Sequence, residues 1–480
     1  MTFSFTTARR KTLRTQVVMV VLGCLLVAGS IRSLPAQSPP ASSTLHMTAT
    51  DRKALETALD AYDQGNAAAA EPVLRDLTRR YPGSYEANEA LGSLYVESGA
   101  ETQALPYLEH ACAIAPRQAI AHANLGAAYL KLSRTTDAIR ELQKATVLEP
   151  KNGATQSNLG QALMLANQPT TAAKAFAIAS AAAPQDWGLR YNWALALYTA
   201  GSTEQAAAVL AKIPAASMSD QAHALAGDVE EKLGHFKEAV LHYQAAAQIN
   251  PSEANLYTLT VEFLRHWTWD EALQIANYGA ARYPAATRFK VAAGIALYGN
   301  SKYPAAVEAL APLLASDPDN ALYADLLGRS CSLIAEGESA DCNGLEEFAR
   351  RHPDNARAAL YAATGILHRP AAQQDTAKVE QFLNQAIAAD PKLAQAYYQL
   401  GVLEQQRSQW KQSAVVLEKA IALRPAYPEA HYRLSRAYAH LGMREQAQQQ
   451  MALQQQYSQQ EKDNLNARMQ EVVTFLLKTN

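Results

Sequence analysis

Apolar positions in this chain recur at the spacing of one face of an α-helix, and the same run of residues then returns further along. The stretches AHANLGAAYL (121–130), TQSNLGQALM (155–164) and RYNWALALYT (190–199) each place an asparagine directly before a bulky apolar residue. Within each stretch, apolar side chains follow at intervals of three or four residues, which is the periodicity of an amphipathic helix. Strand-like alternation is scarce, so the pattern predicts an all-α protein.

The helical pattern belongs to a longer period of about 34 residues, which is the signature of a repeat architecture. Each unit of such an array stacks on its neighbours because it cannot bury its apolar face alone. The sequence therefore predicts helical hairpins over residues 51–461 instead of separate globular domains. Twelve units in register begin at Asp51, Tyr85, Ala119, Gly153, Trp187, Asp220, Ala254, Thr287, Ala321, Ala356, Ala394 and Pro428.

A few positions define the unit. Position 8 is mostly glycine and position 20 mostly alanine, which lets the two helices of a hairpin approach closely, while positions 11 and 24 carry larger side chains beside that contact. Proline at position 32 ends the second helix, since it cannot continue a helix and forces the residue before it out of the α region. In the third unit, positions 8, 20, 24 and 32 are Gly126, Ala138, Leu142 and Pro150.

This combination, with tyrosine frequent at position 11 and alanine at position 27, resembles the tetratricopeptide repeat. The resemblance implies a right-handed superhelical solenoid, with the first helices lining a concave face and the second helices forming the back. The end of such a stack needs a cap, and we expect residues 462–480 to form a capping helix over the last repeat. Its apolar residues follow helical spacing: Leu465, Met469, Val472, Val473 and Leu476.

Three units depart from the pattern, and we expect bends or loops there. The fifth unit loses its usual ending at Ile213–Asp220, the ninth carries two cysteines, and the tenth inserts residues around HRPAAQQD (368–375).

The N-terminus has the layout of a secretory signal. Basic residues between Arg9 and Arg14 precede an apolar run from Val17 to Ile31, and Ala36 offers a small residue for cleavage. The sequence thus predicts a signal peptide at 1–36, a Pro/Ser/Thr-rich tether at 37–50, and export to the periplasm or the exterior. An uncleaved anchor, or lipidation of Cys24, would instead tie the protein to a membrane.

Charge narrows the range of partners. The formal net charge is −2, and about −7 without the first 36 residues, which hold five basic side chains and no acidic one. No cluster of lysine and arginine marks a nucleic-acid footprint or a membrane-surface helix. We expect protein or peptide partners.

Catalytic and metal-binding motifs are not found in the sequence. The eleven histidines show no HExxH spacing, CxxC is absent, and nearly every glycine sits at a repeat position, which leaves no phosphate-binding loop. Repeats and cap fill residues 51–480, so no stretch is left for a separate catalytic fold. The sequence predicts a protein that is not an enzyme and needs no cofactor.

Two cysteines of the ninth unit form a candidate disulfide. Cys331 occupies a core-facing position of the first helix and Cys342 falls near the start of the second. An antiparallel hairpin brings two such positions within bridging distance, and an exported protein is exposed to oxidation. The alternative is a pair of small buried thiols, which is how we interpret Cys112.

The leading hypothesis for function is an exported scaffold that binds peptide segments or partner proteins along its concave face. The alternative is a structural or accessory component of an envelope assembly, secretion or polysaccharide machine. The sequence hardly separates the two.

The candidate binding residues are the recurrent asparagines Asn124, Asn158 and Asn192, all at position 6 of a first helix. A side-chain amide offers the same donors and acceptor as a peptide bond, so it can bind an extended backbone. The row resembles the asparagine ladder of O-linked N-acetylglucosamine transferase, and an apolar wall is expected beside it. That wall comprises Tyr191, Leu195 and Tyr198. Alternatively, the asparagines are solvated or bond to the adjacent helix.

Overall fold

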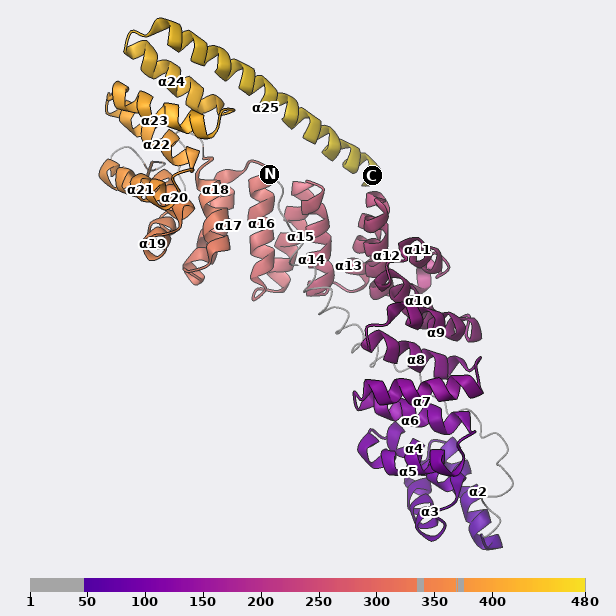
Figure 1. The fold of residues 1–480 in the computed structure, drawn as a ribbon. Helices are drawn as coiled ribbons and strands as arrows, with labels where there is room; N and C mark the ends of the chain where they lie inside the picture. The colour runs from indigo at the N-terminus through magenta and orange to yellow at the C-terminus, as the bar shows by residue number, and fades with distance from the viewer. Residues whose placement is uncertain (1–46, 335–340, 368, 370–374, 480) are drawn as a thin grey trace. The chain divides into compact units, whose positions relative to one another are not determined.

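Helices account for nearly all of the described chain. The computed structural model describes residues 47–334, 341–367, 369 and 375–479, with side chains up to 463, and within these residues it contains no strand. The helices form antiparallel hairpins (Figure 1). The predicted signal peptide and most of the predicted tether lie outside the described residues.

The first helices begin where the repeat units begin. In ten of the twelve units the first helical residue is the predicted first position of the unit. These helices are α2 (Ala49–Asp63), α4 (Tyr85–Glu97), α6 (Ala119–Lys131), α8 (Gly153–Leu165), α10 (Trp187–Thr199), α12 (Asp220–Leu233), α14 (Glu253–Arg265), α16 (Thr287–Gly299), α18 (Ala321–Cys331), α20 (Ala356–Leu367), α22 (Ala394–Gln406) and α24 (Pro428–His440).

The second helices mostly end two residues before the repeat proline. They are α3 (Ala67–Arg80), α5 (Glu101–Ile114), α7 (Thr135–Leu148), α9 (Pro169–Ala182), α11 (Thr203–Leu210), α13 (Phe236–Ile249), α15 (Trp269–Arg282), α17 (Tyr303–Ser316), α19 (Gly344–Arg351), α21 (Thr376–Ala389), α23 (Trp410–Leu423) and α25 (Arg444–Thr479). The structure thus confirms the all-α repeat architecture; the handedness of the superhelix stays a prediction.

Polar residues directly before the units fix the helix starts. Ser84, Asn152 and Asp186 each accept a hydrogen bond from the backbone N–H three residues ahead. Such caps satisfy one of the N–H groups that a helix leaves unpaired at its beginning. Each unit start is therefore encoded locally.

Glycine at position 8 sets the closeness of each hairpin. A Cβ added to Gly126 would lie 2.6 Å from Cγ of Leu142, and one added to Gly160 would lie 2.8 Å from the ring of Phe176. In both cases the partner follows 16 residues later, at position 24, as the sequence predicted. The ninth unit differs, because Tyr361 of the next unit occupies the space beside Gly328.

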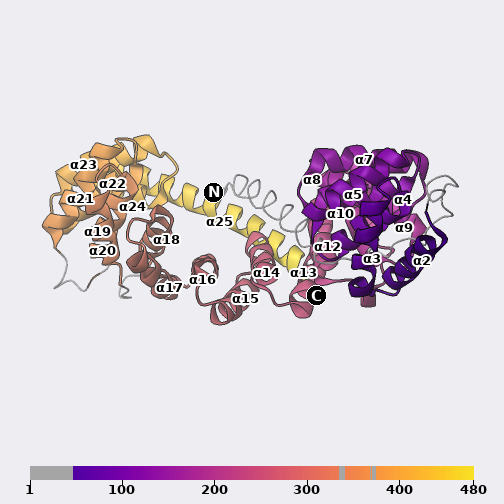
Figure 2. The ribbon, with the colours of Figure 1, turned by 90° about the horizontal axis from the view of Figure 1, so that it is seen from below.

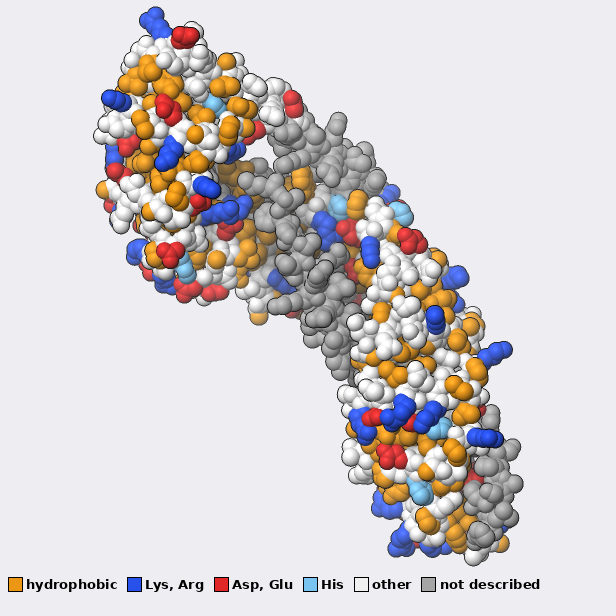
Figure 3. Space-filling model, viewed as in Figure 1, with side chains coloured by type: hydrophobic (Ala, Val, Ile, Leu, Met, Phe, Trp, Pro, Cys, Tyr) orange, Lys and Arg blue, Asp and Glu red, His pale blue; other side chains and the backbone are white. Residues whose placement is uncertain are grey.

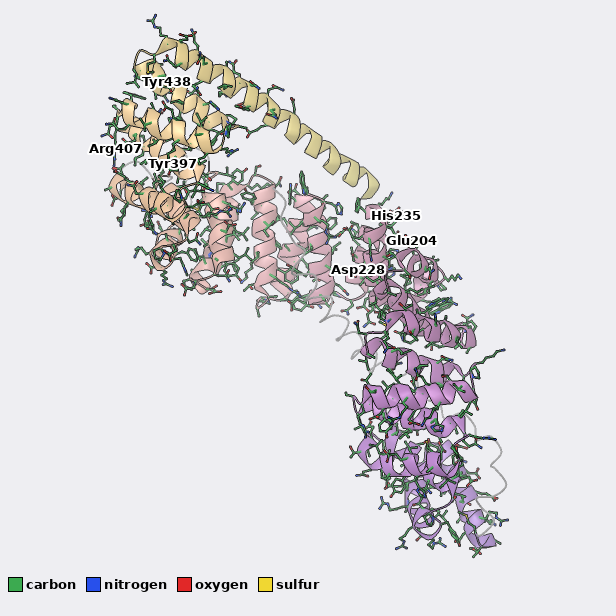
Figure 4. The ribbon with its side chains drawn as sticks, viewed as in Figure 1. Glu204, Asp228, His235, Tyr397, Arg407 and Tyr438 are labelled. Carbon is green, nitrogen blue, oxygen red and sulfur yellow. A yellow bond between two sulfur atoms is a disulfide. The ribbon has the colours of Figure 1, made fainter. Side chains whose placement is uncertain are left out.

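A side chain at position 4 binds the carbonyl of the proline that ends the preceding repeat. In each case the hydrogen bond spans six residues, so it joins the end of one hairpin to the beginning of the next; Figure 4 labels one of these residues, Tyr397. The carbonyl would otherwise be left unpaired behind a helix that cannot continue. We call this bond the proline clamp. Its members are Asn88 on Pro82, His122 on Pro116, Gln156 on Pro150, Tyr397 on Pro391 and His431 on Pro425.

The chain divides into two compact units. The first, Met1–Met218, contains α2 to α11 and a short 3-10 turn at Ala215–Ser217, and the second, Ser219–Asn480, contains α12 to α25 (Figures 1 and 2). The division falls within Ile213–Asp220, where the fifth repeat loses its ending. This departure from the pattern is therefore a boundary.

The other two departures lie in the second unit. In the ninth repeat α19 has only 8 residues, and residues 335–340 before it lie outside the described chain. Most of the tenth-repeat insertion, 368 and 370–374, lies outside it as well.

The last helix joins two segments that the sequence treats separately. Helix α25 has 36 residues and continues past residue 461 without a break. It packs against α24 as the second helix of the twelfth hairpin. The side chains expected to cap the last repeat lie beyond residue 463, outside those described, so the capping role of 462–480 stays a prediction.

Candidate functional site

Asn124, the first residue of the proposed ladder, bonds to the adjacent first helix. From α6 its Nδ2 donates to Oε1 of Glu89 at 2.6 Å and to Oγ of Ser93 at 2.8 Å, both on α4. Burial raises the pKa of Glu89, and the hydrogen bonds from Ser93 and Asn124 offset part of that rise. Because an amide nitrogen has two hydrogens, Asn124 has spent both donors, and its Oδ1 is the atom left for another molecule.

Asn158 and Asn192 occupy the same position on the next two first helices. Both are half-buried, on α8 and α10 respectively. Within the described chain, the side chain of Asn158 makes no hydrogen bond. The structure therefore places the three asparagines on successive helices without bonding them to one another.

The predicted apolar wall on α10 is partly internal. Tyr191 is only 8% exposed, whereas Leu195 and Tyr198 are half-buried. At the position after the ladder, Leu125 and Leu159 are buried as expected. Leu195 and Tyr198 therefore offer most of the apolar surface of this group.

The best-formed hollows lie elsewhere. One lies between α2 and α3 and is lined largely by alanine, including Ala54, Ala58 and Ala61; a second surrounds Phe348 and His352 in the other unit. On the face that Figure 3 presents, lysine and arginine are interspersed with aspartate and glutamate. The asparagine row is thus a surface for an extended ligand and does not form a small-molecule pocket.

A buried triad in the first unit escaped the sequence analysis. Ligand atoms of Cys112, His122 and Glu141 lie within 4.8 Å of one another. His122 Nδ1 lies 2.8 Å from Oε2 of Glu141, and its Nε2 is the proline-clamp atom on Pro116. Burial raises the pKa of the Cys112 thiol to about 12. Since both imidazole nitrogens already have partners, this triad is explained as part of the hairpin core.

A larger polar cluster in the second unit also escaped it: Glu231, Glu262, Arg265 and His266 meet where α12 contacts α14. Residues 34 or 35 apart occupy like positions on adjacent first helices, and Glu231 precedes His266 by 35 residues. A search at that spacing would have found this pair.

The two cysteines of the ninth repeat meet at bonding distance. Their sulfur atoms lie 2.03 Å apart and their Cα atoms 6.3 Å apart, so the structure bears out the predicted Cys331–Cys342 pair. Cys112 is free and buried. Among the described residues, no helix combines the length and apolar character needed to cross a membrane.

Comparison with known proteins agrees with the repeat pattern. Three family models, each described as a tetratricopeptide repeat, match the sequence; the first covers 55–119, 157–220 and 291–331, the second 220–253 and the third 404–468. A search of curated proteins found no match.

Similar solved structures are also repeat proteins, at low identity. YrrB, a TPR protein with an unusual peptide-binding site, is 18% identical, with 38% of this chain and 94% of that chain covered and a TM-score of 0.36. A tetratricopeptide repeat protein from Parabacteroides merdae is 16% identical, with 52% and 100% covered and a TM-score of 0.37. Naa15/Naa10 bound to HypK-THB is 14% identical, with 84% and 68% covered and a TM-score of 0.38.

Proposed function

Because this chain belongs to the tetratricopeptide repeat family, we propose that it is a non-catalytic scaffold that binds extended segments of partner proteins along its first helices. Proteins built from this repeat generally bind other proteins or peptides. The proposal for this chain rests on the row of amides formed by Asn124, Asn158 and Asn192. The observation that carries it is Asn158, a half-buried amide without a hydrogen bond in the described chain.

The spacing of the helices suits an extended ligand. Packed helices lie about 8–10 Å apart, and an extended chain advances about 3.3 Å per residue, so one amide per repeat meets about every third ligand residue. Asn124 enters as an acceptor for a ligand N–H, because Glu89 and Ser93 take its two donors. Leu195 and Tyr198 supply apolar contact for the ligand's side chains.

This mode of binding predicts which changes weaken it. We expect Asn158→Ala combined with Asn192→Ala to weaken the binding of peptides selected from a displayed library of short unstructured sequences. Two lost hydrogen bonds cost about 2 kcal/mol, or a Kd about 30-fold higher. Fluorescence anisotropy with the selected peptides measures the change.

The matched control is Asn277→Ala, an exposed asparagine on the second helix α15, which should leave the Kd unchanged. Methylating backbone nitrogens of the peptide should weaken binding, since the Asn124 acceptor loses its donor. A double variant that binds as tightly as the original chain would exclude the row as a binding surface.

We further propose that the protein is exported and works in the periplasm or outside the cell. The basic and apolar start of the chain supports this, and so does the Cys331–Cys342 pair, since disulfides persist in oxidising compartments.

Export predicts a shortened mature chain. We expect cell fractionation and N-terminal mass spectrometry to find the protein outside the cytoplasm, beginning at about residue 37, because Ala36 is the expected cleavage site. A cytoplasmic protein that begins at Met1 or Thr2 would contradict export.

A further inference from the structure

Three ligand-type side chains converge where α12 contacts α14. Glu231 lies near the end of α12, Glu262 lies in the last turn of α14, and His266 directly follows that helix. One ligand atom from each lies within 4.8 Å of the other two. Glu262 and His266 are four residues apart and therefore share a helix face, while Glu231 reaches them from the preceding repeat.

One of the converging atoms has no hydrogen bond. Glu262 is 1% exposed, and its Oε1 is buried without a hydrogen-bond partner. A buried carboxylate oxygen in that state costs free energy unless another group or an ion satisfies it. The atom closest to it among the titratable groups is Nε2 of His266, at 3.3 Å.

The separations fit metal ligands better than hydrogen bonds. His266 Nε2 lies 3.3 Å from Glu262 Oε1 and 3.4 Å from Glu231 Oε2. Charge-assisted hydrogen bonds are shorter, about 2.7–2.9 Å. Two ligand atoms bound at about 2.0–2.1 Å in a tetrahedral site are about 3.3–3.4 Å apart. The three atoms are thus spaced as edges of such a site.

The outer oxygens of both carboxylates are held by one arginine. Arg265 Nη1 donates to Oε1 of Glu231 at 2.7 Å and to Oε2 of Glu262 at 2.6 Å. This contact fixes the carboxylates so that their other oxygens face His266. Groups that orient metal ligands in this way are typical of metal sites. The ring of Phe236 lies 4.3 Å from the imidazole of His266 and packs against it.

Neighbouring charged groups have other partners. Asp228 accepts a hydrogen bond from Tyr243, and His235 bonds to Glu230; Figure 4 labels Asp228 and His235. Neither belongs to the group of atoms that converge. The side chains of Glu231 and His266 are 11% and 13% exposed, so an ion has a path from the surface.

We propose that Glu231, Glu262 and His266 bind a divalent transition-metal ion, with Zn²⁺ the best fit. An imidazole combined with two carboxylates suits Zn²⁺, whereas Mg²⁺ and Ca²⁺ favour ligand sets made of oxygen alone. Three protein ligands leave a fourth position for water. The ion joins α12 to α14 and so fastens the sixth repeat to the seventh.

The test is a calorimetric titration of the full chain, stripped of metal by a chelator, with Zn²⁺. We expect one ion per chain and a higher melting temperature with Zn²⁺ than without it. Glu262→Gln and His266→Gln should each weaken binding by about 100-fold or more. Circular dichroism verifies that each variant folds, and Glu231→Gln, at a more exposed ligand, replaces any variant that does not.

The buried triad supplies the control. Cys112→Ala should leave Zn²⁺ binding unchanged, and Co²⁺ bound to the original chain should show the visible bands of a tetrahedral site without the near-ultraviolet band of a cobalt–thiolate bond. The proposal is overturned by an absence of binding, by unchanged affinity in the Glu262→Gln and His266→Gln variants, or by loss of binding in Cys112→Ala alone.

Discussion

Replacing Gly227 with valine should destabilise the second unit by about 3 kcal/mol, the cost of overpacking a well-filled contact. A Cβ at Gly227 would lie 2.5 Å from Cε1 of Tyr243, whose side chain is 2% exposed. The ring has no room to retreat, because its hydroxyl donates to Asp228 at 2.7 Å. Helices α12 and α13 must therefore separate. Urea denaturation followed by circular dichroism measures the loss.

The sign of this effect distinguishes packing from helix propensity. In an open helix, alanine in place of glycine stabilises by about 0.5–1 kcal/mol, yet we expect Gly227→Ala to destabilise. The control is Gly344→Ala in α19, where the added Cβ would meet only Cδ2 of Leu314, at 3.4 Å. If Gly227→Ala stabilised the protein as much as Gly344→Ala, position 8 would not set the hairpin contact.

Removing the disulfide is the second large change. Replacing Cys331 and Cys342 together with alanine should cost about 2–3 kcal/mol, because the bond closes a short loop and limits the freedom of the unfolded chain. The sequence separation is 11 residues, and both cysteines are buried.

Thermal unfolding with and without a reductant measures this effect. The original chain should melt at a lower temperature when reduced, whereas the double variant should not respond to the reductant. A reductant that leaves the original melting temperature unchanged, together with two free thiols by mass spectrometry, would mean that the pair is not bridged.

The fold could be predicted because its determinants are local. A capping residue such as Ser84 and a proline such as Pro116 act within a few residues of where they stand, so the chain alone reveals where helices begin and end. The contact between Gly126 and Leu142 is also readable, since both lie in one hairpin, 16 residues apart. The displaced contact at Gly328 was not, because it depends on how short α19 becomes.

The side-chain partners were harder to predict because they cross between hairpins. The period aligns like positions at 34 residues, but several bonds between neighbouring first helices join residues 35 apart, as for Glu89 with Asn124 and Asp220 with Asn255. The period alone does not give this offset. For that reason the sequence left open whether Asn124 faces solvent or the adjacent helix, and it did not bring Glu231 together with His266.

The proline clamp bears on how the chain folds while it is being made. Each clamp spans six residues, so its donor leaves the ribosome or a secretion channel almost immediately after its acceptor. Closing so short a loop costs little entropy and needs nothing from the distant C-terminus. A newly emerged hairpin is thereby docked onto the one before it, and the array grows in the direction of synthesis with little unpaired apolar surface exposed to aggregation.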